Sequence, residues 1–213
     1  MDKKIILVGG GGHCKSVLDS LLELNRFSEI GIIDKKENKG KRILGIPIIG
    51  CDDDLLRLIS EGFKYAFVTV GSIGNPNLRT KLFNQLKEIG FEIPNIVDHS
   101  ATVSRHVKME TGIFVGKNAV INAGSRINKG VIINTGAIIE HDCIIEKFVH
   151  IAPGVVLSGE VHIGANTHVG ANSVIKQRLK IGSDSIIGMG SVVSKDVEDH
   201  MLAYGNPCKG VRK

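Results

Sequence analysis

The second half of the chain repeats one hydrophobic position every six residues. From Val97 to Val193 every sixth residue is aliphatic, and no insertion interrupts the series. If about one residue in three were aliphatic by chance, such a run would have a probability on the order of 10⁻⁸. The members are Val97, Val103, Met109, Val115, Ile121, Ile127, Ile133, Ile139, Ile145, Ile151, Leu157, Ile163, Val169, Ile175, Ile181, Ile187 and Val193. A fixed short period of this kind predicts a solenoid of stacked repeats.

The neighbours of each aliphatic residue follow the same period. The position four residues later is Ser, Thr, Ala or Val in fourteen of the seventeen repeats. Because side chains alternate along a β-strand, this small residue and the aliphatic residue two positions after it both point inward. Three hexapeptides then form one triangular coil, with polar residues and glycine at its corners. The pattern resembles the hexapeptide repeat of left-handed β-helix acyltransferases, and the resemblance covers residues 97 to 197.

Residues 1 to 96 show a different pattern, in which apolar strands alternate with amphipathic helices. Strands are predicted at 5–8, 30–33 and 66–70. The first helix carries Val17, Leu18, Leu21 and Leu22, the second begins at 52–54 and contains Leu55, Leu56, Leu58 and Ile59, and the third begins at Asn75–Pro76 and ends before Gly90. This alternation predicts a small Rossmann-like α/β domain with a parallel sheet at 1–96, followed by the β-helix domain at 97–213.

A run of glycines, Gly9, Gly10, Gly11 and Gly12, joins the first predicted strand to the first helix and is followed by His13. Glycines let the backbone approach a ligand closely, and a helix N-terminus offers N–H groups to a phosphate or carbonyl. The run does not match the dinucleotide fingerprint GxGxxG, because Cys14 occupies the third glycine position. A plain turn between strand and helix with a capping histidine is the alternative interpretation.

The segment Gly9–Lys15 resembles the glycine-histidine loop of the sialic-acid O-acetyltransferase and nucleotide-amino-sugar N-acetyltransferase family, the NeuD/PglD type. The resemblance implies that the residues from Gly9 to His13 surround a sugar nucleotide and that Asp34 faces its base or ribose. Gly71, after the third predicted strand, is assigned to the same substrate site. Members of the family often carry a second acid after that Asp, whereas this chain has Lys35.

A second candidate site is the sequence Glu140-His141-Asp142-Cys143. His141 lies two residues after an aliphatic position, so we expect it at a corner of the coil. Its ordinary pKa of about 6.5 suits it to accept a proton from an attacking amine or hydroxyl. A neighbouring carboxylate would fix its tautomer and stabilise the imidazolium. Cys143 takes the small inward position, so we expect a buried and unreactive thiol.

This segment resembles the E-H-[DE]-C active-site motif of the same family. The resemblance implies that His141 is the general base, that Asp142 orients it, and that His150 contacts the thioester of acetyl-CoA. Nine residues are half a coil, so His141 and His150 of one chain should lie on different sides of the prism. They can meet only across a subunit boundary, which favours a homotrimer with active sites between chains.

The histidines of the β-helix also have a simpler interpretation, without a role in catalysis. They could all be solvated residues of turns and of outward strand faces. His162 is expected on the surface, and His168 lies one coil after His150, where it could only support it. Trimeric β-helix carbonic anhydrases pair two zinc-binding histidines five residues apart, and no histidines here have that spacing. No metal is therefore expected.

The acetyl donor should lie along the groove beyond His150. Ser158 and Gly159 lack bulk and would leave room for the pantetheine arm, while Gly170, Ala171 and Gly188 could offer backbone groups to its amides. Lys176, Lys195 and Lys209 are candidates for the CoA phosphates, or they are solvated. The tail Gly205–Lys209 resembles the closing G-x-P-A-K segment of hexapeptide transferases, with Cys208 in place of Ala.

Composition and charge narrow the remaining function classes. The four cysteines form no CxxC pair and are expected to be reduced thiols in the cytoplasm. The apolar run at 5–8 is too short for a signal peptide or a membrane span. A net charge of +5 would attract phosphates, but nucleic acid is disfavoured because lysines and arginines are interspersed with acids and aromatic residues make up 4%.

The sequence therefore predicts an acetyl-CoA-dependent acetyltransferase that acts on the amine of a nucleotide-linked amino sugar without an acyl-enzyme. Sialic-acid O-acetylation is the first alternative, and the motifs do not separate the two reactions. A non-catalytic β-helix scaffold would have no use for the Glu140–Cys143 motif or the glycine loop. An acetyltransferase for serine or another small metabolite would leave the N-terminal domain unexplained.

Overall fold

The computed structural model describes residues 3–212, and they form two compact units. The first unit comprises Met1–Gly71 and Asn77–Ile96, and the second comprises Ser72–Pro76 and Val97–Lys213. The short segment Ser72–Pro76, which lies between a strand and a helix of the first unit along the chain, thus belongs structurally to the second. No helix in the described range is long and apolar enough to cross a bilayer.

The first unit is the predicted parallel α/β fold. Its strands are β1 (Lys4–Val8), β2 (Glu29–Ile33), β3 (Arg42–Ile43), β4 (Ile46–Gly50) and β5 (Tyr65–Val68), in the sheet order β3-β4-β2-β1-β5. Its helices are α1 (Gly12–Leu24), α2 (Leu55–Ser60) and α3 (Asn77–Ile89), with single 3₁₀ turns at Lys36–Asn38 and Asp52–Asp54. Only the edge hairpin β3–β4 is antiparallel among the described strands of this sheet.

The first unit differs from the sequence prediction in three details. The hairpin β3–β4 was not predicted, because Gly45 and Pro47 interrupt its apolar residues. Helix α3 begins at Asn77, after Pro76 rather than at it. Leu22 and Leu56 are exposed, because each helix buries a narrower stripe than its apolar residues suggest.

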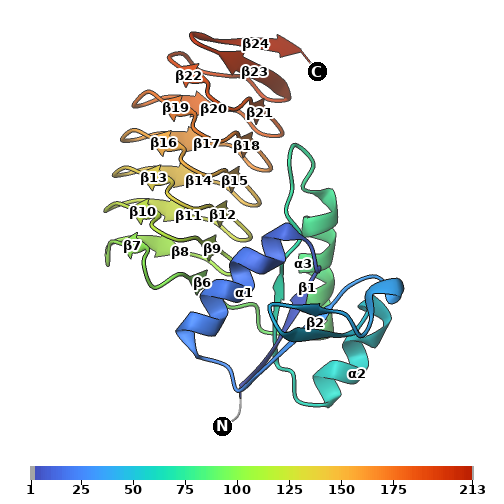
Figure 1. The fold of residues 1–213 in the computed structure, drawn as a ribbon. Coiled ribbons are helices and arrows are strands. Elements are labelled where there is room, and N and C mark those ends of the chain that lie inside the picture. Colours follow the sequence, from blue (N-terminus) through green and yellow to red (C-terminus); the bar gives the residue numbers. More distant parts are fainter. Residues whose placement is uncertain (1–2, 213) are drawn as a thin grey trace. The chain divides into compact units, whose positions relative to one another are not determined.

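The second unit is the predicted left-handed parallel β-helix, with two-residue strands at every hexapeptide (Figure 1). We name its three sheets by their middle strands. The β13 sheet contains β7 (Thr102–Val103), β10 (Val120–Ile121), β13 (Ile138–Ile139), β16 (Val156–Leu157), β19 (Val174–Ile175) and β22 (Val192–Val193). The β14 sheet contains β8 (Lys108–Met109), β11 (Arg126–Ile127), β14 (Ile144–Ile145), β17 (His162–Ile163) and β20 (Lys180–Ile181).

The third sheet, the β15 sheet, ends in a hairpin. It contains β6 (Ile96–Val97), β9 (Phe114–Val115), β12 (Ile132–Ile133), β15 (His150–Ile151), β18 (His168–Val169), β21 (Ile186–Ile187), β23 (Met201–Gly205) and β24 (Cys208–Arg212). All of its described pairs are parallel except β23–β24.

The repeat predicted from the sequence sets the register of every coil. Each aliphatic residue pairs with the aliphatic residue one coil later, as in Ile121↔Ile139 and Ile139↔Leu157. From Val115 onward the aliphatic column is buried in the core, and Val97, Val103 and Met109 pack against it partly buried. Buried hydroxyl groups at the small position two residues before the aliphatic one bond to backbone; for example, Ser125 Oγ donates to the Glu140 carbonyl at 2.9 Å and accepts from the Cys143 N–H at 3.1 Å. The corners are thereby fixed relative to the core.

Candidate active site

His141 lies at the corner between β13 and β14, as predicted, with 57% of its side chain exposed. Its Nδ1 lies 2.9 Å from Asp142 Oδ2. Because an ionised carboxylate only accepts hydrogen bonds, Nδ1 carries the proton in the neutral ring, and Nε2 presents its lone pair. Asp142 takes a left-handed turn conformation with φ of 59°. The corner therefore holds a base and its orienting acid in place.

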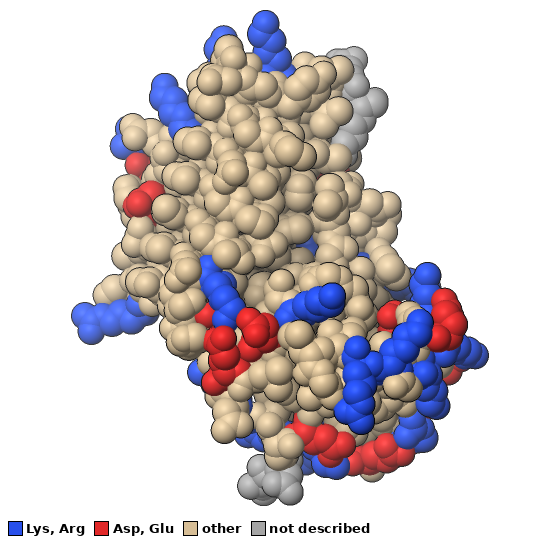
Figure 2. All heavy atoms as spheres, viewed as in Figure 1, with Lys and Arg blue, Asp and Glu red and all other residues tan. Residues whose placement is uncertain are grey.

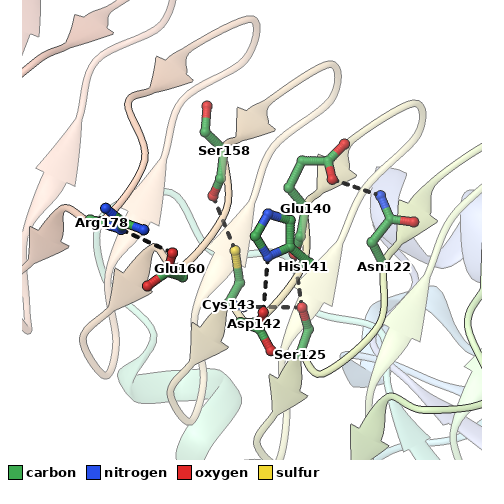
Figure 3. Close-up of polar contacts among 9 residues, drawn as sticks. All are labelled: Asn122, Ser125, Glu140, His141, Asp142, Cys143, Ser158, Glu160 and Arg178. Carbon is green, nitrogen blue, oxygen red and sulfur yellow. Dashed lines mark hydrogen bonds and ion pairs between the residues drawn. The ribbon is translucent and has the colours of Figure 1, made fainter.

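The surroundings of His141 favour its protonated form. The hydrogen bond to Asp142 raises the pKa of His141, and the charges of Asp142, Glu140 and Glu160 add to this effect. Glu140 is held by a hydrogen bond from Asn122 Nδ2 at 3.0 Å, and Glu160 pairs with Arg178 at 3.0 Å (Figure 3). The ring can therefore accept a proton during a reaction and be stabilised as the imidazolium.

Cys143 lies next to this dyad and is not a candidate nucleophile. Its side chain is fully buried, and burial raises the pKa of the thiol to about 11. Its Sγ donates to the Ser158 carbonyl at 3.3 Å. The thiol thus joins two coils of the stack, in agreement with its predicted inward position.

Gly159 lies directly against the His141 ring, one coil further along the stack. A Cβ at position 159 would come within 2.5 Å of His141 Nε2 and 2.6 Å of Cε1. The predicted reason for a small residue here was space for pantetheine, but the structure shows a more immediate one, since the imidazole itself occupies the space a side chain would need. Ser158 and Lys176 follow β16 and β19 at the same edge, which we call the His141 edge.

His150 lies on a different part of the prism, in the β15 sheet, and faces a hollow of about 430 Å³. Gly170, Ala171 and Gly188 line the same hollow, at the turns from the β15 sheet to the β13 sheet, which we call the Gly170 edge. His168 stacks on His150 with ring centroids 4.9 Å apart. Four predicted acetyl-CoA residues are thus brought together.

The structure divides the predicted acetyl-CoA residues between two sides of the β-helix. His150, Gly170, Ala171 and Gly188 share the hollow, whereas Ser158, Gly159 and Lys176 lie at the His141 edge. Lys209 lies on the final strand β24, paired with Tyr204. Since the His141 edge joins the β13 and β14 sheets, and His150 belongs to the β15 sheet, the two groups do not meet within one chain.

The α/β unit holds a separate cavity of about 400 Å³ at the carboxyl ends of its strands, lined by Gly9 and Asp34 among others. Gly9 has a φ of 109°, and its carbonyl accepts a hydrogen bond from Thr69 Oγ1 at 2.6 Å. A Cβ on Gly10 would lie 2.7 Å from Asp34 Oδ2. The glycine loop and the predicted acid therefore lie side by side, as a ligand at the ends of parallel strands requires.

The other predicted substrate residues lie around this loop rather than in the cavity lining. Gly11 and Gly12 are exposed at the start of α1, and no other atoms crowd the position of a Cβ on either. A Cβ on Gly71 would lie 3.5 Å from the Cβ of His13. Burial and, to a lesser extent, the charge of Arg79 lower the pKa of His13 to about 4. His13 is therefore neutral at pH 7.

The sequence patterns did not predict Arg79 as a site residue, nor four of the residues that line the cavity. Arg79 is only 3% exposed and takes the first position of the buried stripe of α3. Burial lowers its pKa to about 10. A charged residue in the i, i+3, i+4, i+7 stripe was the available signal. Lys36, Cys51, Asp52 and Asp53 also line the cavity. They were missed because the hairpin that brings them there was not predicted.

Two family descriptions match the sequence. The PglD N-terminal domain matches residues 4–86, and the bacterial transferase hexapeptide (six repeats) matches 142–177 and 160–195. No curated protein matches the sequence significantly.

Several solved structures resemble the whole chain. A histidine-to-asparagine variant of perosamine N-acetyltransferase from Caulobacter crescentus, in complex with CoA and GDP-perosamine, is 34% identical with a TM-score of 0.93, and the match covers 99% of this chain and 97% of that chain. The acetyltransferase domain of PglB from Neisseria gonorrhoeae, in complex with acetyl coenzyme A, is 34% identical with a TM-score of 0.93, covering 99% and 100%. WeeI from Acinetobacter baumannii is 25% identical with a TM-score of 0.87, covering 98% and 100%.

These relatives extend over both units at sequence identities of up to 34%, and the two family descriptions fall on the units whose folds they name. The chain belongs to the NeuD/PglD-type family of hexapeptide-repeat acetyltransferases.

Proposed function

We propose that the protein transfers the acetyl group of acetyl-CoA to the amine of a nucleotide-linked amino sugar. The observation that carries this proposal is the His141–Asp142 dyad, exposed at a corner, in which Nδ1 lies against the carboxylate and Nε2 is left as the basic nitrogen of the neutral ring. Similarity to a perosamine N-acetyltransferase whose complex holds CoA and GDP-perosamine supports the donor and the substrate class. Two of the similar structures are variants in which a histidine is replaced, which agrees with a histidine in the reaction.

The reaction follows from the geometry of the dyad. Nε2 of His141 accepts a proton from the neutral amine of the sugar as the nitrogen attacks the thioester carbonyl carbon. Asp142 stabilises the resulting imidazolium through Nδ1–H. A backbone N–H stabilises the tetrahedral oxyanion. The C–S bond then breaks, and the imidazolium returns a proton to the departing CoA sulfur. No acyl-enzyme forms, in keeping with the burial of Cys143.

The acetyl-CoA site is proposed at the hollow beside His150, with Gly170, Ala171 and Gly188 presenting backbone to the pantetheine arm. Lys176 and Lys209 are proposed to meet the CoA phosphates. The sugar nucleotide is proposed to bind at the glycine loop, where Gly9, Gly10, Gly11 and Gly12 lead into the N-terminus of α1. Asp34 would accept hydrogen bonds from the ribose, and His13 and Gly71 would support the loop.

Assembly as a homotrimer would join the two halves of the active site. The outward residues of the β13 sheet are aliphatic along five successive coils: Val120, Ile138, Val156, Val174 and Val192. The outward residues of the β14 sheet include Lys108, Arg126 and Lys180. A continuous apolar face of this kind favours association with another copy.

Threefold symmetry then fixes which edges meet. If three prisms turn their β13 sheets toward a common axis, the two edges of each sheet meet the opposite edges of its neighbours. The His141 edge of one subunit thereby meets the Gly170 edge of the next. His141 of one chain and the hollow beside His150 of its neighbour would form one active site.

In the face shown in Figure 2 the β-helix unit carries few charged side chains, whereas both signs of charge are interspersed over the α/β unit.

The test is release of free thiol from acetyl-CoA over a panel of amino-sugar nucleotides and sialic acids. We expect turnover with an amino-sugar nucleotide, and a kcat reduced roughly 10²- to 10⁴-fold in His141→Asn with acetyl-CoA binding retained. His162→Asn is the matched control, because His162 lies on the same β-helix, in the β14 sheet, and its Nε2 lies 3.3 Å from Glu146 Oε1. If sialic acid were the only acceptor turned over, the proposed reaction would be O-acetylation rather than N-acetylation. Full activity in His141→Asn would refute the assignment of His141 as the general base.

A further inference from the structure

The segment Ser72–Pro76 connects β5 to α3, yet it packs with the β-helix. The backbone carbonyl of Ser72 lies 2.6 Å from His150 Nδ1, although 78 residues separate them in the sequence. Gly74, with a φ of 72°, lies so close to Ile186 that a Cβ there would be 2.5 Å from its Cδ1. This segment is therefore held against the β15 sheet at the His150 hollow.

The contact with Ser72 determines which nitrogen of His150 carries the proton. A carbonyl oxygen only accepts hydrogen bonds, so Nδ1 must donate, and in the neutral ring Nε2 is the acceptor. Asn134 agrees with this arrangement. Its Oδ1 accepts the Thr135 N–H at 3.0 Å, which turns its amide Nδ2 toward His150 Nε2 at 3.4 Å. In the neutral ring Nε2 therefore carries a lone pair, which faces the Asn134 amide, rather than an N–H.

The same segment supplies one lip of the hollow. Ile73 lines it and is 83% exposed, and Met189, which also lines it, is 82% exposed. They are the most exposed large hydrophobic side chains within the described residues. Water-exposed aliphatic groups on the rim of one hollow mark a surface that an apolar ligand covers.

The chemistry of the lining indicates which part of the donor binds there. Among the described residues, the lining includes aliphatic side chains, glycine backbone, Asn134 and two histidines, and it has no Lys, Arg, Asp or Glu. The diphosphate of CoA would find no counter-charge in such a place. The pantetheine arm, with its dimethyl group and two amides, matches apolar walls and a few hydrogen-bonding groups.

We infer that Ser72 and Ile73 belong to the acetyl-donor site: Ser72 fixes His150 as the Nδ1–H tautomer, and Ile73 and Met189 close over the pantetheine arm. This inference rests on the proposed function. In this tautomer Nδ1–H is held by the Ser72 carbonyl and Nε2 faces the Asn134 amide, so His150 offers no N–H to the donor, and the oxyanion of the reaction is left to a backbone N–H. Donor binding thereby depends on a segment that the sequence places between elements of the α/β unit.

The first test compares Ile73→Ser with Leu56→Ser in the full-length protein. Leu56 is a matched control, because it is 69% exposed, lies on α2 and lines neither cavity. We expect Ile73→Ser to raise the Kd for CoA and the KM for acetyl-CoA roughly fivefold to thirtyfold, with the KM for the sugar nucleotide and the melting temperature unchanged. Leu56→Ser should change none of these values. Met189→Ser should resemble Ile73→Ser.

Calorimetry and sedimentation separate the outcomes. The wild-type protein should bind CoA and release thiol from acetyl-CoA. If it does so, and Ile73→Ser binds CoA with the same Kd as the wild-type protein, the inference is wrong while the proposed function stands. If Ile73→Ser alters the sedimentation coefficient without altering CoA affinity, a second subunit covers Ile73, and the inference is also overturned. Failure of the wild-type protein to bind CoA would overturn the proposed function itself.

The second test addresses the tautomer of His150 directly. In ¹⁵N-labelled protein, the nitrogen shifts of the His150 ring should report Nδ1–H and an unprotonated Nε2. In Gly74→Ala, the added Cβ and the positive φ should displace the segment and weaken this preference. Observation of Nε2–H as the main tautomer in the wild-type protein would overturn the assignment of Ser72.

Discussion

Substitution of Gly159 by alanine should disable the active site by moving His141 rather than by unfolding the β-helix. The position equivalent to Gly159 one coil later is Gln177, so this corner accepts a side chain where no imidazole lies on it. An alanine Cβ would stand 2.5 Å from Nε2. Carbon and nitrogen atoms need about 3.5 Å, so the ring must shift by about 1 Å.

The size of the effect follows from that displacement. A misplacement of about 1 Å costs on the order of 10²-fold in rate, and we expect this loss in the kcat of Gly159→Ala. The ring is half-exposed and can turn into solvent, so the melting temperature should stay near the wild-type value. The moved ring also leaves Asp142, whose hydrogen bond is the main cause of the raised pKa of His141.

The pH profile distinguishes this mechanism from general damage. A general base works in its neutral form, so kcat rises with pH through the pKa of His141. Because that pKa is raised in the wild-type protein, loss of the Asp142 bond should move the acid limb of the profile to lower pH while the plateau falls. Measuring the rate of thiol release from pH 5 to 9 gives both the position of the acid limb and the plateau value of kcat. An unchanged kcat, or a reduced kcat with an unmoved acid limb, would refute the reasoning; introducing Gly159→Ala into His141→Asn should cause no further loss.

Three further predictions concern other parts of the molecule. Asp142→Asn keeps a residue that tolerates the left-handed turn but removes the carboxylate, so kcat should fall roughly 10- to 10³-fold and the acid limb should move to lower pH, as rate measurements across pH would show. Gly9→Ala should lower the free energy of unfolding by about 2 kcal/mol in denaturant titrations, because Gly9 has a φ of 109° and its Cβ would lie 2.6 Å from Val70 Cγ2; unaltered stability would contradict the strained loop. Val156→Glu should convert the proposed trimer to monomers in sedimentation experiments and abolish thiol release, whereas a persistent trimer would exclude the β13 sheet as its interface.

The sequence predicted the β-helix well because its physical signal is local and repeated. Each hexapeptide carries its own inward aliphatic residue, so Ile139 alone sets the corner on which His141 lies. The glycine loop and Asp34 were predictable for a similar reason, since parallel strands bring their carboxyl ends to one edge.

What the sequence could not predict depends on contacts between distant segments. Nothing near Ser72 indicates that its carbonyl reaches His150, and Gly159 shows no local sign that an imidazole from the preceding coil occupies its space. The apolar pattern of the second helix predicted that Leu56 is buried, but this side chain is 69% exposed. An apolar residue at the margin of the stripe need not be buried. Arg79, in contrast, could have been found from the sequence, because it occupies a position of the apolar stripe of α3.

The closing hairpin has a consequence for the ends of the stack. A parallel β-helix that simply stopped would offer open strand edges in the polarity needed to add another coil, and a second copy could extend it into a fibre. Here β23 continues the β15 sheet in parallel, but β24 turns back against it, so the outermost edge runs in the opposite direction. An incoming coil would meet the wrong polarity on that side. The hairpin thus terminates growth of the solenoid and leaves sideways assembly through the prism faces as the open route to an oligomer.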